Sequence, residues 1–369
     1  MPSLVDLTRL DAAALASLPP GEEPHLAVIV PACNEEESIE ATLRSLLGSV
    51  GIRLEIIAVN DRSTDRTGAL MEEVARLAVE GSHRLRVIHL KELPAGWLGK
   101  PHAMAKAAQQ TTAPWLLFTD ADVVFAPNAL ALALRHAIAD RADHLCLALT
   151  LDFRSVGEAA VLATMTVLAQ RTIRFWKIAD PRARDYFGTG AFNLIRRAVY
   201  SQLGGFEALR MEVVEDLCLG WKVKHAGFAQ RLVLGPGLVN IRWIQGAFGV
   251  VHLAEKNAFA VYRYHVWLLL LGCLGLAATI VFPFAALAAS GWTPLAGILL
   301  YVSIALGYVA CRRFTQVSPW LAIFFAPAAA IVLFASLRSM VLTLHRNGVE
   351  WRGVRYPLDE LRKNAGRLW

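Results

Sequence analysis

The sequence predicts an α/β protein with a doubly wound, mostly parallel sheet, followed by interfacial helices and C-terminal transmembrane helices. Between His25 and Asp120, short apolar runs alternate with stretches whose apolar residues have helical spacing, which is the pattern of repeated βαβ units. Hydrophobic residues make up 55% of the chain and charged residues only 18%, against about a quarter charged in soluble domains. This composition excludes a disordered, collagen-like or purely soluble polar chain.

The strands are predicted from apolar runs that end at polar or turn-forming residues, as the first one does at Pro31. The predicted strands are 26–30, 54–59, 86–90 and 115–119, and the predicted helices between them are 35–47, 64–78 and 103–110. Polar residues follow three of these strands, namely Asn34-Glu35, Asp61, and the pair Asp120 and Asp122. Because ligands bind beyond the carboxyl ends of parallel strands, these loops are expected to meet at one crevice.

The C-terminal part of the chain is predicted to enter a membrane. Segments 266–289 and 295–311 lack Asp, Glu, Lys and Arg, and a third apolar segment, 320–337, contains Pro327. The first two are long enough to cross a bilayer. Upstream, the apolar run 159–169 is too short to span, which leaves open a core helix or a helix lying against lipid. The aromatic and basic stretch 242–264 leads directly into the first span and is expected to lie at the interface.

Basic residues predict the orientation. Arg312-Arg313 belong on the cytoplasmic side by the positive-inside rule, and residues 1–21 show no signal-peptide pattern. The first domain is therefore expected in the cytoplasm and the protein in the cell (inner) membrane as a multi-pass protein. The tail from Arg346 carries six Lys or Arg against three Asp or Glu, which also favours the cytoplasmic side. Since three full crossings would place it outside, the third segment is expected to re-enter or bend at Pro327.

The charge and the cysteines limit the possible partners. The formal net charge is +6, but Lys and Arg are spread through the first part of the chain and denser near the hydrophobic segments. This favours an anionic membrane surface over a nucleic-acid partner. The five cysteines are scattered, without a CxxC motif, so they indicate a reducing compartment rather than a disulfide framework or a zinc site.

The strongest chemical signal is Asp120-Ala-Asp122, directly after a predicted strand. Two carboxylates one residue apart can bind one hard divalent metal ion, Mg²⁺ or Mn²⁺, whose remaining positions water and a diphosphate fill. Asp61, at a strand-to-helix turn, can accept from a base N–H, and Lys100 is a candidate diphosphate contact. Pro31, Asn34 and Glu35 offer backbone and side-chain groups to a nucleoside. A solvated turn and a surface lysine remain the alternatives for the DxD motif and for Lys100.

Glu215-Asp216 follow the turn Gly204-Gly205-Phe206. One of these carboxylates can act as a general base that takes the proton of an acceptor hydroxyl. Taken together with the other candidate site residues, the acidic pair favours Asp216 as this base. The alternative is an exposed acidic pair at a helix start. The Walker A, GxSxG and HExxH patterns are absent from the sequence.

These residues resemble family 2 glycosyltransferases of the GT-A fold over roughly residues 25 to 260. The resemblance is carried by five segments in order: 28–36 (VIVPACNEE), 59–65 (VNDRSTD), 120–122 (DAD), 188–197 (GTGAFNLIRR) and 204–216 (GGF to ED). It implies a nucleotide-sugar donor, a divalent metal at Asp122 with Asp120, a nucleoside contact at Asp61, and Asp216 as the base. It further implies inversion by direct in-line displacement.

The membrane segments resemble the branch of this family that glycosylates membrane lipids, such as ceramide glucosyltransferases and hopanoid- or carotenoid-associated bacterial enzymes. Acceptor or diphosphate contacts are then expected at Gly190, Glu215, Arg242 and Trp243. One departure is that related enzymes carry a Gln/Arg-x-x-Arg-Trp motif, whereas Val239 occupies its first position here. Processive polysaccharide synthesis is the alternative, disfavoured because two or three spans supply little of a polymer channel.

The resulting hypothesis is a metal-dependent transferase that moves one sugar to a lipid acceptor at the cytoplasmic face. A nucleotidyltransferase and a non-catalytic membrane partner of the same fold are the remaining alternatives. The expected organisation is an N-terminal extension (1–24), a cytoplasmic GT-A domain (25–235), an amphipathic segment (236–264), a transmembrane region (265–344) and a basic tail (345–369).

Overall fold

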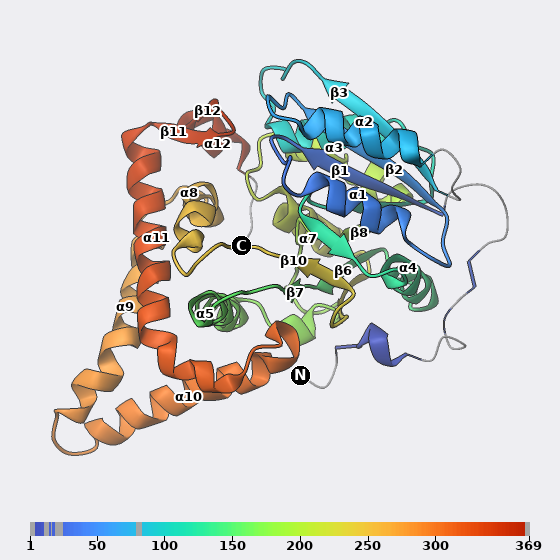
Figure 1. Cartoon of the computed structure of the whole chain (residues 1–369). Helices are drawn as coiled ribbons and strands as arrows, with labels where there is room; N and C mark the ends of the chain where they lie inside the picture. The colour runs from blue at the N-terminus through green and yellow to red at the C-terminus, as the bar shows by residue number, and fades with distance from the viewer. Residues whose placement is uncertain (1–3, 11–14, 16, 19–24, 79–82, 366–369) are drawn as a thin grey trace. The chain divides into compact units, whose positions relative to one another are not determined.

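The computed structural model of the chain describes residues 4–10, 15, 17–18, 25–78 and 83–365 (Figure 1). Parts of the expected N-terminal extension (1–3, 11–14, 16 and 19–24) and of the expected basic tail (366–369) lie outside the described residues. The described residues up to Thr150 and from Arg174 to Ile241 form one compact unit, which we call the sheet unit. Residues Leu151–Ile173 and Arg242–Ala365 form a second one, the helical unit.

The sheet unit contains, in its described part, a seven-stranded sheet in the order β3-β2-β1-β4-β8-β6-β9. The strands are β1 (Leu26–Ala32), β2 (Leu54–Asp61), β3 (Arg84–Leu90), β4 (Trp115–Phe118), β6 (His144–Ala148), β8 (Asn193–Arg196) and β9 (Gln230–Leu234). Strands β1 to β4 pair in parallel, as do β6 and β9, and only β8 runs antiparallel to its neighbours. The predicted mostly parallel α/β sheet is confirmed, and β1 is buried along its whole length because both faces are covered.

Helices connect and cover these strands. They are α1 (Ile39–Leu47), α2 (Thr67–Leu77), α3 (Gly99–Ala108), α4 (Ala129–Ala139), α6 (Arg197–Gln202) and α7 (Glu215–His225). Short strands β5 (Val123–Phe125), β10 (Val239–Ile241) and β7 (Thr150–Leu151) form a second sheet. Helix α3 begins at Gly99, before the predicted residue 103, so Lys100 lies in its first turn and not on a loop. Pro101 fits this turn because its missing N–H would have no helical partner there.

The helical unit is built from long helices and a small hairpin. Its elements are α5 (Val156–Thr172), α8 (Gly249–Val261), α9 (Val266–Leu287), α10 (Thr293–Thr315), the 3₁₀ helix η5 (Pro319–Phe324), α11 (Phe325–His345), the hairpin β11 (Gly348–Trp351) and β12 (Val354–Pro357), and α12 (Leu358–Asn364). On α5, Ala163 and Val167 share one apolar cluster with Ile304 and Tyr308 of α10. The Thr164 hydroxyl is hydrogen-bonded to that of Tyr308 at 2.5 Å. Helix α5 therefore packs on a membrane-length helix along one face.

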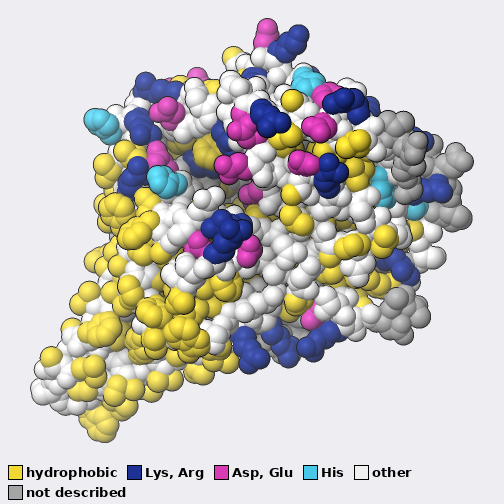
Figure 2. Space-filling view, viewed as in Figure 1, with side chains coloured by type: hydrophobic (Ala, Val, Ile, Leu, Met, Phe, Trp, Pro, Cys, Tyr) yellow, Lys and Arg dark blue, Asp and Glu magenta, His cyan; other side chains and the backbone are white. Residues whose placement is uncertain are grey.

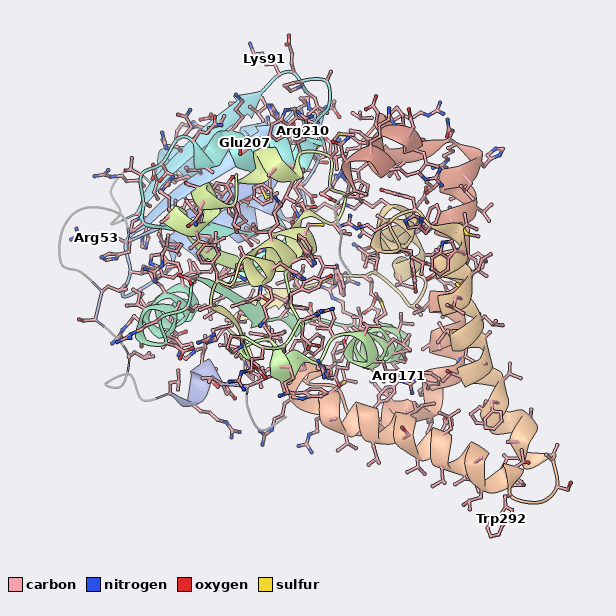
Figure 3. All side chains as sticks on the ribbon, turned by 180° about the vertical axis from the view of Figure 1, so that it is seen from behind. Arg53, Lys91, Arg171, Glu207, Arg210 and Trp292 are labelled. Atoms are coloured by element: carbon pink, nitrogen blue, oxygen red, sulfur yellow. The ribbon has the colours of Figure 1, made fainter. Side chains whose placement is uncertain are left out.

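Three helical stretches of the described chain are long and apolar enough to cross a membrane: 266–287, 293–315 and 319–345. Hydrophobic side chains cover the surface of α9 and α10 (Figure 2), including Leu271 and Leu299, which are 61% and 59% exposed. Trp292 stands at the turn between these two helices (Figure 3) and is 83% exposed. Large exposed apolar surfaces indicate contact with lipid or protein, and tryptophan is enriched at membrane interfaces.

The third apolar segment changes direction before Pro327, not at it. The 3₁₀ helix η5 returns along α10, where the Tyr301 hydroxyl donates a hydrogen bond of 3.0 Å to the Ala322 carbonyl. Helix α11 then begins at Phe325 and continues without interruption to His345. The expected break at Pro327 is therefore wrong by a few residues. Pro327 lies in the first turn of α11, where a proline does not disturb the helix.

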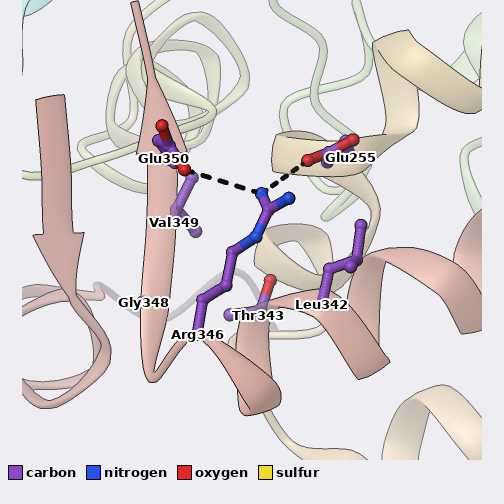
Figure 4. A pocket seen from close by; sticks show the side chains of 7 residues that line it. All are labelled: Glu255, Leu342, Thr343, Arg346, Gly348, Val349 and Glu350. Carbon is purple, nitrogen blue, oxygen red and sulfur yellow. Dashed lines mark hydrogen bonds and ion pairs between the residues drawn. The ribbon is translucent and has the colours of Figure 1, made fainter. Parts of the chain in front are cut away.

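Helix α11 ends beside α8, the helix that precedes α9. The Glu255 carboxylate of α8 accepts hydrogen bonds from Arg338 at 2.7 Å and from Arg346 at 2.8 Å. Figure 4 shows Arg346 between Glu255 and Glu350. The end of α11 is therefore fixed to the helix that leads into α9.

Candidate active site

The loops after β1 and β2 are joined by hydrogen bonds. The Asn34 side-chain oxygen accepts from the Thr64 backbone N–H at 2.8 Å, and the Asn34 N–H donates to the Ser63 hydroxyl at 3.1 Å. The Glu35 N–H donates to the Thr67 hydroxyl at 2.7 Å. Asn34 has a φ of 57°, a conformation that asparagine tolerates better than most residues. The side-chain oxygen of Asn34 therefore helps to fix the two loops against each other.

Asp61 ends β2 and is 4% exposed. Both of its carboxylate oxygens accept hydrogen bonds from the Arg62 guanidinium, at 2.8 and 2.9 Å. Arg62 has a φ of 58°, a strained conformation for a residue with a side chain. Sequence reasoning missed Arg62, whose position between a strand and a helix start is its one visible signal. Pro31 is buried in β1, opposite Val59 of β2.

The first turn of α3 joins Asp61 to the second group of acidic residues. A Cβ atom on Gly99 would lie 2.5 Å from the Asp61 Oδ2 atom, so a larger residue there would have to displace the Asp61 carboxylate. The next residue, Lys100, places its Nζ atom 2.6 Å from Asp120 Oδ1 and 2.7 Å from Glu215 Oε1. Burial by itself lowers the pKa of Lys100, but the charges of Asp120, Glu215 and Asp216 raise this pKa well above its usual value.

Asp122 is the predicted metal ligand of the site. Its Oδ1 atom is buried and has no hydrogen-bond partner in the described part of the chain. Burial, with the nearby Asp120 and Glu35 carboxylates, raises the pKa of Asp122 to about 7. The residues that the structure describes contain no group of three or more His, Cys, Asp or Glu side chains placed to hold a metal. Two carboxylates with an unpartnered oxygen fit Mg²⁺ or Mn²⁺, which take one or two carboxylates together with substrate phosphates.

Asp216 lies in the first turn of α7, next to Glu215, and is half-buried. Its Oδ1 atom accepts a hydrogen bond of 2.7 Å from the Leu217 N–H. Burial and the Glu215 charge raise the pKa of Asp216 to about 6, while Lys100 acts in the opposite direction. A carboxylate with a pKa near neutrality can take and release a proton under physiological conditions.

Two glycines of the segment 188–190 allow the chain to approach these side chains. A Cβ atom on Gly190 would lie 2.5 Å from Asp120 Oδ2 and 3.0 Å from Lys100 Nζ. A Cβ atom on Gly188 would lie 1.8 Å from the Asp216 carbonyl oxygen. The predicted residue Gly190 is therefore placed against the Asp120–Lys100 pair, and Gly188 against the backbone of Asp216.

A buried polar network supports the Asp216 turn. Asn193 donates a hydrogen bond of 3.4 Å from its side-chain nitrogen to the Asp216 carbonyl, and its side-chain oxygen pairs with His144. Gln230 donates to the ring of His144 at 3.0 Å and to the carbonyls of Phe187 and Gly220. The sequence did not predict these three side chains as part of the site, because the other residues of their strands are mostly apolar.

The structure thus brings together Asp61, Lys100, Asp120, Asp122, Gly190, Glu215 and Asp216 in the sheet unit. Arg242 and Trp243 belong to the helical unit. There, the Arg242 guanidinium lies 3.6 Å from the Glu158 carboxylate, and Trp243 is 43% exposed. Val239 is fully buried in β10.

Residues 27–204 match the family described as Glycosyl transferase family 2. The sheet unit of this chain thus carries a family 2 glycosyltransferase domain. The chain is 29% identical over 216 residues to the probable glycosyltransferase YdaM of Bacillus subtilis, covering 56% of this chain and 48% of that protein. It is 24% identical over 228 residues to the 4,4'-diaponeurosporenoate glycosyltransferase of Staphylococcus haemolyticus, covering 60% and 58% respectively. The matched region of this glycosyltransferase spans about half the length of these curated relatives.

The fold of this glycosyltransferase is similar to that of the mannosyltransferase PcManGT from Pyrobaculum calidifontis, which was solved in complex with GDP-Man and Mn²⁺. The two structures have a TM-score of 0.51 at 18% sequence identity, and the alignment covers 89% of this chain and 91% of the other. This likeness confirms the expected GT-A fold.

Proposed function

We propose that this glycosyltransferase moves a single sugar from a nucleotide sugar to the hydroxyl of a membrane lipid at the cytoplasmic face. The proposed donor is a UDP-sugar. The observation that carries the proposal is the cluster of Lys100, Asp120, Glu215 and Asp216 at the sheet edge. The same chain carries three helical stretches of membrane length. The chain thus combines residues suited to bind a nucleotide sugar with helices suited to a membrane.

The donor would be bound by two groups of residues, the Asp61–Arg62 pair and the acidic cluster around Lys100. The Asp61–Arg62 pair presents carboxylate and guanidinium groups to a nucleobase at the end of β2. Lys100 holds Asp120 and Glu215 in place and contributes positive charge near the diphosphate. When bound at Asp122 and Asp120, a divalent cation would stabilise negative charge on the departing nucleoside diphosphate.

Transfer would be a single in-line displacement. The acceptor oxygen forms a bond to the anomeric carbon as the bond from that carbon to the diphosphate oxygen breaks. Asp216 takes the proton of the acceptor hydroxyl, and the nucleoside diphosphate leaves with the electron pair. The raised pKa of Asp216, about 6, matches this role because the group is ionised near pH 7 and is basic enough to take a proton in the transition state. The configuration at the anomeric carbon is inverted.

The acceptor is assigned to lipid from the helical unit. Its exposed apolar surface over α9 and α10 suits a bilayer (Figure 2). Helix α10 ends with Arg312-Arg313, and this pair favours a cytoplasmic location of that end of the helix. One curated relative is named as a glycosyltransferase of 4,4'-diaponeurosporenoate, which supports an apolar acceptor.

The test uses the purified full-length protein in vesicles, with labelled UDP-sugars and GDP-Man, Mg²⁺ or Mn²⁺, and extracted membrane lipids. We expect metal-dependent labelling of one lipid class and release of a nucleoside diphosphate. Asp216→Asn should still bind donor but lose transfer, whereas Glu207→Gln, on an exposed turn of the same unit (Figure 3), should behave as wild type. Release of pyrophosphate would instead indicate a nucleotidyltransferase. Labelled products of more than one sugar would indicate a processive synthase, and no transfer with any donor would refute the proposal.

A further inference from the structure

Glu158 is a buried carboxylate in the first turn of α5, with an exposed fraction of 3%. Its Oε1 atom accepts a hydrogen bond of 2.6 Å from the Gly246 N–H, and its Oε2 atom accepts one of 2.5 Å from the Arg154 N–H. These backbone hydrogen bonds hold the pKa of Glu158 below its usual value. The residue is therefore an anion at neutral pH, and it fixes the loop 242–248 to α5.

The same carboxylate faces Arg242. The distance from Arg242 NH2 to Glu158 Oε1 is 3.6 Å, and the Arg242 Nε atom is buried without a hydrogen-bond partner in the described residues. Val239, which occupies the position where related enzymes have a polar residue, is an aliphatic side chain buried in β10. In this chain, the polar partner of Arg242 thus comes from α5 and not from the strand before it.

The loop that Glu158 holds is amphipathic. Trp243 is 43% exposed and Phe248 is 68% exposed, on either side of Gly246, whose φ is 70°. An arginine followed in the same loop by two exposed aromatic side chains suits a molecule with a polar head and an apolar body. A lipid acceptor has this chemistry, and the loop leads through α8 into the first membrane-length helix.

We infer that Glu158 is a positioning residue that orients Arg242 toward the polar head of the lipid acceptor. The inference rests on the proposed function, and it adds a residue outside the resemblance to known enzymes. Loss of the negative charge would leave one of the two N–H groups, of Gly246 or Arg154, without an acceptor and would release Arg242. The expected consequence is weaker use of the acceptor with an unchanged donor site.

The main variant is Glu158→Gln, which keeps the size of the side chain but removes its charge and turns an N–H donor toward one of the two backbone N–H groups. Ser155→Ala is the matched control, since the Ser155 hydroxyl caps the same helix at the Glu158 N–H (3.2 Å) without touching the carboxylate. Both variants weaken the start of α5, so a general structural effect would appear in both. Only the first changes the environment of Arg242.

Two measurements are made on the full-length protein in vesicles. Hydrogen exchange of the peptide covering 242–248 should be at least tenfold faster in Glu158→Gln than in wild type or Ser155→Ala. The KM for the lipid acceptor should rise about tenfold in Glu158→Gln, with the KM for the donor unchanged. In an Arg242→Gln background, Glu158→Gln should have no further effect on the acceptor KM, because the carboxylate acts through this arginine.

Equal exchange in all three proteins would overturn the inference, as would an unchanged acceptor KM or an equal effect of Glu158→Gln with and without Arg242. The exchange measurement does not require turnover. If wild type transfers no sugar, the proposed function fails and the positioning role for an acceptor falls with it, while the exchange data still decide whether Glu158 holds the loop.

Discussion

The Nζ atom of Lys100 lies 2.6 Å from the Oδ1 atom of Asp120, and the same ammonium group is 2.7 Å from Glu215. One cation therefore links the acidic residues after β4 with those at the start of α7. Lys100 has an unusually high pKa because three carboxylates outweigh the effect of its burial. It is the charge that allows these carboxylates to lie close together.

Replacing Lys100 with methionine is expected to reduce both stability and activity. Asp120 and Glu215 would lose their common partner, and removal of one member of a buried ion pair costs about 3–5 kcal/mol. Part of that cost is relieved by solvent, since the side chain of Asp120 is 34% exposed. We expect a lower unfolding temperature and at least a hundredfold loss of transfer. Lys106→Met, an exposed change on the same helix, serves as control, and equal effects of the two changes would contradict the role of Lys100.

Asp122→Asn should separate stability from activity. The environment of Asp122 raises its pKa to about 7 and so disfavours the charged carboxylate. At pH 8 the group is nevertheless ionised. The neutral amide removes this unfavourable charge and should therefore raise the unfolding temperature when no metal is added. The same change removes a metal ligand and should reduce transfer by roughly 10²–10³-fold. Unfolding curves with and without Mn²⁺, together with a transfer assay, measure both effects.

Asp65→Asn provides the opposite case. Asp65 accepts hydrogen bonds from the Thr67 N–H at 2.9 Å and from its hydroxyl at 2.6 Å at the start of α2. We expect this variant to lose stability and to keep its response to Mn²⁺. A destabilised Asp122→Asn protein with normal transfer would show that Asp122 serves the fold and not the metal.

The fold was predictable because it depends on local patterns. Strands β1, β2 and β4 are mostly apolar runs. Asp61 ends β2, and Asp120 and Asp122 follow β4, so all three lie at carboxyl ends that meet on one edge of the sheet. Parallel pairing alone brings such residues together. The identity of the acidic residues at the site was therefore readable from the sequence, although their roles remain predictions.

The pairs within the site were not predictable in this way. No periodic pattern in the sequence marks the ion pairs between side chains. These pairs join Arg62 to Asp61, Lys100 to Glu215, and Arg242 to Glu158. Each depends on the angle at which a turn leaves its strand or helix. The return of η5 along α10 was equally hidden, because an apolar segment gives no sign of its direction.

Gly188→Ala should be among the most damaging small changes in the sheet unit. The added methyl group would lie 1.8 Å from the Asp216 carbonyl oxygen, so the backbone of the base must move. Overpacking costs about 1–3 kcal/mol and occasionally more, and a displaced base should reduce kcat with little change in donor affinity. Gly48→Ala is the control because its nearest contact would be at 3.5 Å. Normal kcat in Gly188→Ala would show that Asp216 does not need this approach.

The buried network under Asp216 predicts a pH dependence of stability. Burial lowers the pKa of His144 to about 4, whereas an unfolded histidine has a pKa of about 6.5. Between these values the unfolded chain takes up a proton that the folded protein does not, so stability is full above about pH 6.5 and falls as the pH drops toward 4, by about 3 kcal/mol. Glutamine at position 144 can still donate to Asn193 and accept from Gln230 but does not titrate. His144→Gln should therefore lose less stability than wild type between pH 7 and pH 4.5, as measured by denaturant unfolding in detergent, and parallel pH curves for the two proteins would rule out His144 as the titrating group.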